Sequence, residues 1–159
     1  LPVIFICENN FYATHAHQLT RQAKDNLLQR SQAFGVPAVR INGNNVVEVF
    51  CASKDAIKRA RLGGGPTLIE CRTYRWLGHV GPDYDHNLGY RTKKELMEWV
   101  KRCPIKTFEY FLLKQEIINN SEIRKMLDKI DAQIGKAVSF ARISAAPQPE
   151  DLISDVYRL

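Results

Sequence analysis

The stretch VIFIC at residues 3–7 decides the fold class of this chain. It is β-branched and aromatic without polar alternation, which is typical of a strand covered on both faces in a parallel sheet. Two further strands are predicted at 38–41 and 67–71, and helices are predicted at 25–34 and 45–61 between them. Strand, helix, strand, helix, strand in this order is typical of a parallel α/β sheet with crossover helices.

The helix predicted before the third strand carries the clearest signals. Asn45 followed by Glu48 has the spacing of a capping box, and Gly63 opens a run of three glycines that ends the helix. Basic residues fill the last turn, where the helix dipole favours cations. The apolar residues expected to face the core are Val46, Val49, Phe50, Ile57 and Ala60.

The pattern changes after Arg75. Residues 76–91 are rich in glycine and polar side chains without periodicity, which predicts an exposed functional loop. From Lys93 onward, apolar residues recur at helical spacing, and Asn120 or Ser121 is placed to cap a long helix. We therefore predict an α/β region at 1–92 followed by a helical region at 93–159. A fully covered strand usually lies in mid-sheet, so we expect 1–92 to be the back half of a doubly wound domain, with its first strands upstream.

Composition and charge exclude several classes of protein. The 159 residues hold 23 Lys and Arg against 17 Asp and Glu, a net charge of +6, but acids are interleaved throughout. A nucleic-acid-binding protein needs a concentrated basic stripe, and none is visible. No apolar run approaches the roughly 20 residues that span a bilayer, and no signal peptide is recognisable. Four widely spaced cysteines without a CxxC pair indicate a reducing, intracellular compartment.

Asn9, Asn10, Phe11 and Tyr12 follow the first strand directly. Ligands of parallel α/β sheets bind at the carboxyl ends of the strands. An asparagine oxygen and a nearby backbone carbonyl are hard, neutral donors suited to Mg²⁺, which usually also holds phosphates. By spacing alone, asparagines that cap a turn are the simpler interpretation.

Several blocks of the sequence, taken together, are more informative than the two asparagines alone. LPVIFICENNFY at 1–12 resembles the end of the thiamine-diphosphate motif in alpha subunits of 2-oxo acid dehydrogenases, which opens with Gly-Asp-Gly and closes with Asn-Asn. Four more blocks follow in the family's order: AFGVPAVRINGN at 33–44, GPTLIECRTYRW at 65–76, GH at 78–79 and YRT at 90–92. The resemblance covers essentially the whole chain and implies that 1–92 is the back half of a thiamine-diphosphate-binding domain.

The resemblance also implies the site residues. The ligands of Mg²⁺ would be the side chain of Asn10 and the backbone oxygen of Tyr12, with a third ligand, the aspartate of Gly-Asp-Gly, upstream of Leu1. His79 matches the histidine that contacts the diphosphate of the cofactor, and it is the expected catalytic residue. Without the resemblance, a solvent-exposed loop histidine would be the simpler interpretation of His79.

The implied reaction is decarboxylation of a 2-oxo acid on thiamine diphosphate, followed by acyl transfer to a lipoyl domain. The expected substrate type is pyruvate. The implied partners are a beta subunit, in an assembly of two alpha and two beta chains, and a lipoyl-bearing acyltransferase; no nucleic-acid or membrane partner is expected. The alternatives are an acetoin-cleaving enzyme of the same family and a truncated, non-catalytic subunit kept for assembly.

Val80 stands where the regulated mitochondrial members carry a phosphorylatable serine. This departure favours a bacterial-type subgroup over one controlled by a kinase. The expected location is the cytoplasm if the protein is bacterial and the mitochondrial matrix if it is eukaryotic.

Overall fold

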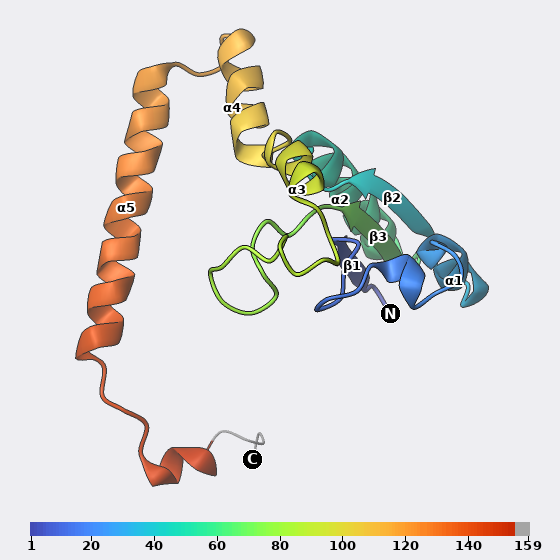
Figure 1. Cartoon of the computed structure of the whole chain (residues 1–159), viewed down its shortest axis with the longest axis horizontal. Coiled ribbons are helices and arrows are strands. Elements are labelled where there is room, and N and C mark those ends of the chain that lie inside the picture. The colour runs from blue at the N-terminus through green and yellow to red at the C-terminus, as the bar shows by residue number, and fades with distance from the viewer. Residues whose placement is uncertain (155–159) are drawn as a thin grey trace. The chain divides into compact units, whose positions relative to one another are not determined.

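A computed structural model describes residues 1–154 (Figure 1). The chain divides into two compact units, Leu1–Phe111 and Leu112–Leu159, which are described separately. Three parallel strands form the sheet of the first unit: β1 (Ile4–Asn9), β2 (Ala38–Asn42) and β3 (Thr67–Arg72). Their spatial order is β1-β3-β2, so β3 is the central strand. The predicted parallel α/β sheet is confirmed, while the division of the chain after residue 92 stays a prediction.

The helices of the chain match the predicted segments. The first unit holds a short 3-10 helix η1 (Gln18–Thr20), α1 (Leu27–Ala33), α2 (Val46–Arg61) and α3 (Lys93–Val100). Helix α4 (Pro104–Lys114) follows and crosses the boundary between the units. The second unit holds α5 (Asn120–Ile143) and a 3-10 helix η2 (Pro149–Leu152). Residues 155–159 of the predicted helical region lie outside the described residues.

The prediction that the first strand is covered on both faces, with further strands upstream, stays a prediction. Strand β1 is an edge strand, in which Phe5 is 50% and Ile6 54% exposed. The covered strand is β3, where the side chains of Ile69 and Glu70 are fully buried. The continuous apolar run of β1 predicted a strand correctly.

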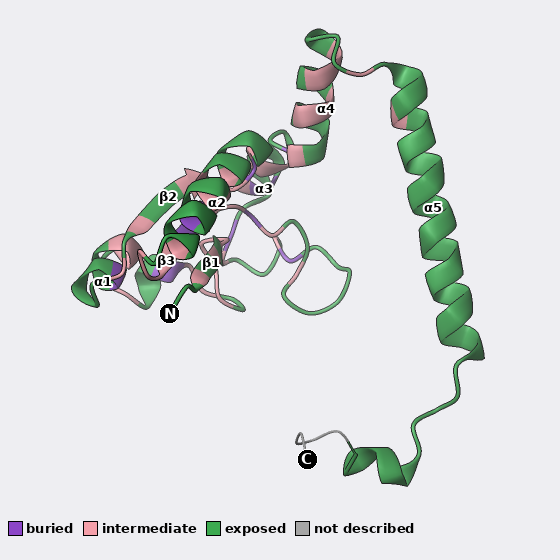
Figure 2. Ribbon diagram, turned by 180° about the vertical axis from the view of Figure 1, so that it is seen from behind, coloured by how far each residue is buried: buried purple, intermediate pink, exposed green. Residues whose placement is uncertain are grey.

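Helix α2 packs on the sheet through small residues instead of the predicted large ones. Ala56 joins Ile69 and Cys71 in the buried core, and Ala52 lies against the same cluster. Phe50, by contrast, is 66% exposed. Most of α2 is coloured as exposed in Figure 2. The face that includes the alanines lets the helix approach the sheet closely, so the predicted core positions of Val46, Phe50 and Ile57 were wrong.

Two predicted helix starts differ from the observed ones. Asp25 does not cap α1, because the N-cap residue is Asn26 and the Asp25 carboxylate pairs with two arginines. The cap of α5 is Asn119, one residue before the predicted position: its side chain accepts a hydrogen bond from the Glu122 amide, and the Glu122 carboxylate accepts one from the Asn119 amide. The cap at Asn45 is confirmed, since its side chain accepts from the amides at the start of α2.

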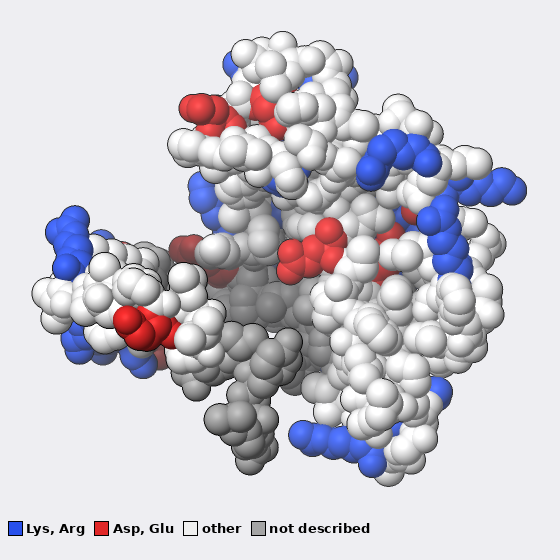
Figure 3. All heavy atoms as spheres, turned by 90° about the horizontal axis from the view of Figure 1, so that it is seen from below, with Lys and Arg blue, Asp and Glu red and all other residues white. Residues whose placement is uncertain are grey.

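No helix within residues 1–154 is both long enough and apolar enough to cross a membrane. On the face shown in Figure 3, Lys and Arg are interspersed with Asp and Glu among uncharged residues.

Candidate functional site

The carboxyl end of β1 leads into a strained turn. Phe11 has a φ of 69°, in the left-handed region that residues other than glycine seldom adopt. Two asparagine side chains hold this conformation: Asn9 Oδ1 accepts from the Phe11 amide at 3.0 Å, and Asn10 Oδ1 accepts from the Tyr12 amide at 2.9 Å. Strained backbone of this kind is concentrated at functional sites.

The oxygens of this turn suit Mg²⁺ in kind. Asn10 offers an amide oxygen with a second lone pair beyond its bond to the Tyr12 amide, and Tyr12 offers a backbone carbonyl. Mg²⁺ takes about six oxygen ligands, so these two neutral groups leave most positions to water, phosphate or other protein groups. Within residues 1–154, no cluster of three or more His, Cys, Asp or Glu is arranged to hold a metal.

An open hollow of about 600 Å³ lies beside the turn. Asn10 and Tyr12 line it, and its charged lining residues are two cations, Arg21 and Arg30, and one carboxylate, Glu8. The hollow therefore offers metal-binding oxygens next to positive charge, which suits a phosphate-bearing ligand.

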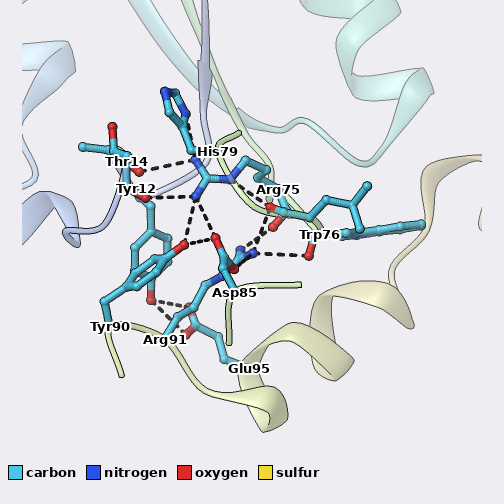
Figure 4. Close-up of polar contacts among 11 residues, drawn as sticks. Tyr12, Thr14, Arg75, Trp76, His79, Asp85, Tyr90, Arg91 and Glu95 are labelled. Carbon is cyan, nitrogen blue, oxygen red and sulfur yellow. Dashed lines mark hydrogen bonds and ion pairs between the residues drawn. The ribbon is translucent and has the colours of Figure 1, made fainter. Parts of the chain in front are cut away.

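The side chain of Tyr12 is held by Glu95 and by two neighbouring tyrosines. Its hydroxyl donates to the Glu95 carboxylate on α3, with O–O distances of 2.8 and 2.9 Å (Figure 4). Burial, followed by the hydrogen bond to Glu95 and its charge, raises the pKa of Tyr12. The ring meets Tyr74 and Tyr90 edge-on. The hydroxyl therefore stays protonated and structural, and the backbone carbonyl is the group left for a metal.

A buried ion pair anchors the predicted loop at 76–91. Arg91 is 4% and Asp85 6% exposed, and Arg91 Nε donates to Asp85 Oδ1 at 2.6 Å. The same guanidinium donates to the carbonyls of Arg75, Trp76 and Leu77 (Figure 4). Burial alone would raise the pKa of Asp85, but hydrogen bonds from Tyr90 and Arg91 and the charges of the arginines outweigh it and lower the pKa.

Arg75 connects this loop to the loop after β1. Its guanidinium donates to the carbonyls of Ala13 and Thr14, each at 3.3 Å, and to the Tyr90 hydroxyl at 3.1 Å (Figure 4). It also lies 3.3 Å from Nδ1 of His79. The structure thus brings the loop that holds His79 against the loop that begins at the predicted metal ligands.

The three predicted site residues have different surroundings. Asn10 and Tyr12 lie together in the strained turn, partly buried, whereas His79 is exposed and connects to that region through Arg75. Their roles toward a cofactor stay predictions. Sequence reasoning missed Arg75 and Asp85, because neither has a spacing that marks it. Two aspartates in a loop flanked by arginines are the one hint of an ion pair.

Comparison with known proteins identifies the family. Residues 1–150 match the sequence model of the family described as "Dehydrogenase E1 component". The chain belongs to this family. It is 35% identical over 157 residues to the pyruvate dehydrogenase E1 component subunit alpha-3 of rice chloroplasts. It is 37% identical over 158 residues to the alpha subunit of acetoin:2,6-dichlorophenolindophenol oxidoreductase, and 38% over 157 residues to the alpha subunit of 2-oxoisovalerate dehydrogenase, both of Bacillus subtilis.

These relatives confirm the resemblance to alpha subunits of 2-oxo acid dehydrogenases. The matches cover 99% of the chain but 36%, 46% and 47% of the three relatives, so the chain spans less than half of their length. The E1 family consists of oxidoreductases and implies thiamine diphosphate as the cofactor.

Proposed function

We propose that this chain is the part of a 2-oxo acid dehydrogenase alpha subunit that holds Mg²⁺ and the diphosphate of thiamine diphosphate. The observation that carries the proposal is the strained turn at Phe11, at the carboxyl end of a parallel strand, with a suitable oxygen donor on each side of it. Its sheet would be the back half of a doubly wound thiamine-diphosphate-binding domain, completed by residues upstream.

The residues of the chain would divide the work of binding. Asn10 Oδ1 and the Tyr12 carbonyl would hold Mg²⁺, and His79 would donate a hydrogen bond to a diphosphate oxygen. Arg75 keeps the His79 loop against the Tyr12 loop, so that histidine and metal ligands are presented to one ligand. Thiamine diphosphate, when bound, supplies the carbanion-stabilising chemistry that decarboxylation requires.

The substrate is proposed to be a 2-oxo acid of the pyruvate type, with a lipoyl group as acyl acceptor. The alternative is acetoin, because a relative named for acetoin is as similar to the chain as one named for pyruvate. A beta subunit and a lipoyl-bearing acyltransferase would complete the assembly. The presence of Asn10 and His79 favours a catalytic subunit over one kept only for assembly. Four free cysteines agree with a reducing compartment inside the cell.

The test uses the full-length alpha subunit purified with its beta subunit. Thiamine-diphosphate-dependent reduction of 2,6-dichlorophenolindophenol is measured with pyruvate, 2-oxoisovalerate and acetoin. We expect the highest kcat/KM with pyruvate, and loss of activity in Asn10→Ala. Asn120→Ala, the same change at an exposed position of α5, is the matched control. Turnover with none of the three substrates would overturn the proposed function, and a preference for acetoin would replace the proposed substrate.

A further inference from the structure

A carboxylate lies fully buried in the central strand of the sheet. The side chain of Glu70 on β3 has no exposed surface. Its Oε2 accepts from Arg40 Nε at 2.8 Å, and its Oε1 lies 3.1 Å from Arg72 Nη2. A buried charge persists only where partners compensate it, and two arginines do so here. Besides the two arginines, Glu70 has a third partner.

The third partner of Glu70 is Asn9, the last residue of β1. Asn9 Nδ2 donates to Glu70 Oε1 at 2.6 Å and lies 3.2 Å from Gln18 Oε1. Both neighbours are acceptors, so the amide nitrogen must face them. The amide oxygen is thereby turned toward the following turn, where it accepts from the Phe11 amide at 3.0 Å.

Phe11 is the residue whose backbone needs support, because its φ of 69° is unfavourable for any residue with a Cβ. The Phe11 carbonyl accepts from the Gln18 amide at 2.7 Å. The guanidinium of Arg72, the same group that pairs with Glu70, lies 5.0 Å from the centre of the Phe11 ring. The buried charges and the strained residue therefore form one connected set of contacts.

We propose that Glu70, acting through Asn9, is a positioning residue that holds Asn10 and Tyr12 in their metal-binding arrangement. The inference rests on the proposed function, since it concerns the same metal site. Asn10 and Tyr12 flank Phe11. If the Phe11 backbone relaxed to a more favourable φ, the Asn10 side chain and the Tyr12 carbonyl would rotate relative to each other. Glu70 thus contributes to metal affinity without touching the metal.

The first test measures metal binding directly in the full-length alpha subunit with its beta subunit. Mn²⁺, a paramagnetic probe for the Mg²⁺ site, is titrated in the presence of thiamine diphosphate, and free Mn²⁺ is read by electron paramagnetic resonance. Asn9→Ala keeps the pairs of Glu70 with both arginines, so the fold is retained. We expect a 10–100-fold loss of Mn²⁺ affinity, as for other groups that orient metal ligands. Glu70→Gln should change the affinity in the same direction, and Glu98→Gln, at an exposed position of α3, should leave it unchanged.

A second test separates positioning from general stability. Phe11→Gly and Phe11→Ala both remove the ring, but only glycine accepts a φ of 69° without strain. Asn9→Ala added to Phe11→Ala should lower Mn²⁺ affinity at least tenfold, whereas Asn9→Ala added to Phe11→Gly should lower it less than about threefold. Equal losses in the two backgrounds would overturn the positioning role.

The outcomes also separate this inference from the proposed function. Wild-type enzyme that binds Mn²⁺ and thiamine diphosphate, together with Asn9→Ala that binds Mn²⁺ equally well, would overturn the inference and leave the proposed function intact. Failure of the wild-type assembly to bind the metal and cofactor would overturn both.

Discussion

Removal of the Arg91 guanidinium should release the loop at 75–91. Arg91 is buried, and it donates to the Asp85 carboxylate and to three backbone carbonyls of the loop. Arg91→Ala removes all four contacts and leaves Asp85 buried with its remaining partners, Tyr90 and Arg75. Breaking a buried ion pair by removing one partner costs about 3–5 kcal/mol. Because about 1.4 kcal/mol corresponds to a factor of ten, the population of the open loop should rise by roughly two to three and a half orders of magnitude.

Hydrogen exchange followed by mass spectrometry measures this opening locally in the full-length subunit. Two amides within the loop are protected by hydrogen bonds: Gly78 donates to the Asp83 carbonyl at 2.8 Å, and Leu88 donates to the Asp85 carbonyl at 3.1 Å. In Arg91→Ala their exchange should accelerate toward the unprotected rate. Arg124→Ala removes an exposed arginine with one ion pair on α5 and should leave the loop unchanged. Wild-type exchange rates at both amides in Arg91→Ala would refute the anchoring role of the buried pair.

Three further predictions follow from the same contacts. The folded-state pKa of Asp85 is lowered, so its contribution to stability is present above the ordinary pKa of about 4 and is lost as pH falls below it. The thermal midpoint of wild type should therefore exceed that of Asp85→Asn by less in acid than at neutral pH. A difference that stays constant with pH would contradict this. A Cβ at Gly43 would lie 2.9 Å from a carbonyl oxygen of β3, so Gly43→Ala should lower the free energy of unfolding by about 1–3 kcal/mol in urea titrations, whereas Gly135→Ala, in open space, should not. A protein of residues 1–159 alone should bind thiamine diphosphate and Mg²⁺ weakly or not at all in calorimetry, because Asn10 and Tyr12 supply two neutral ligands; tight Mg²⁺-dependent binding would show that the metal site is built differently.

Short-range patterns predicted the elements of the fold. The spacing of Asn45 and Glu48 predicted the start of α2, and three apolar runs predicted three parallel strands. The same patterns could not predict which strand is central, because the edge strand β1 is more continuously apolar in sequence than β3, which Glu70 interrupts. They also misplaced the core face of α2, since the preference for large apolar residues overlooks a face on which alanines allow close packing.

The candidate site was predictable only where a motif carries it. The pair Asn9 and Asn10 indicated a turn after β1. The structure adds that the backbone of Phe11, between the predicted metal ligands Asn10 and Tyr12, is strained. The ion pair of Asp85 with Arg91 joins residues six apart within a loop without periodicity, and Glu70 reaches Asn9 only through the pairing of β1 with β3. Contacts of this kind depend on tertiary structure, which local sequence spacing does not encode.

Titration of thiamine diphosphate into the full-length alpha subunit with its beta subunit, with and without Mg²⁺, tests the central claim most directly. The account predicts that Asn10→Ala abolishes the dependence of binding on Mg²⁺. It predicts that His79→Ala weakens binding by a factor of about 10 to 150, the equivalent of one charge-assisted hydrogen bond of roughly 1.5–3 kcal/mol. Val80→Ala, at the exposed neighbouring position, should bind as wild type. Wild-type affinity and wild-type Mg²⁺ dependence in both Asn10→Ala and His79→Ala would contradict the assignment of this chain as the part that holds the diphosphate and its metal.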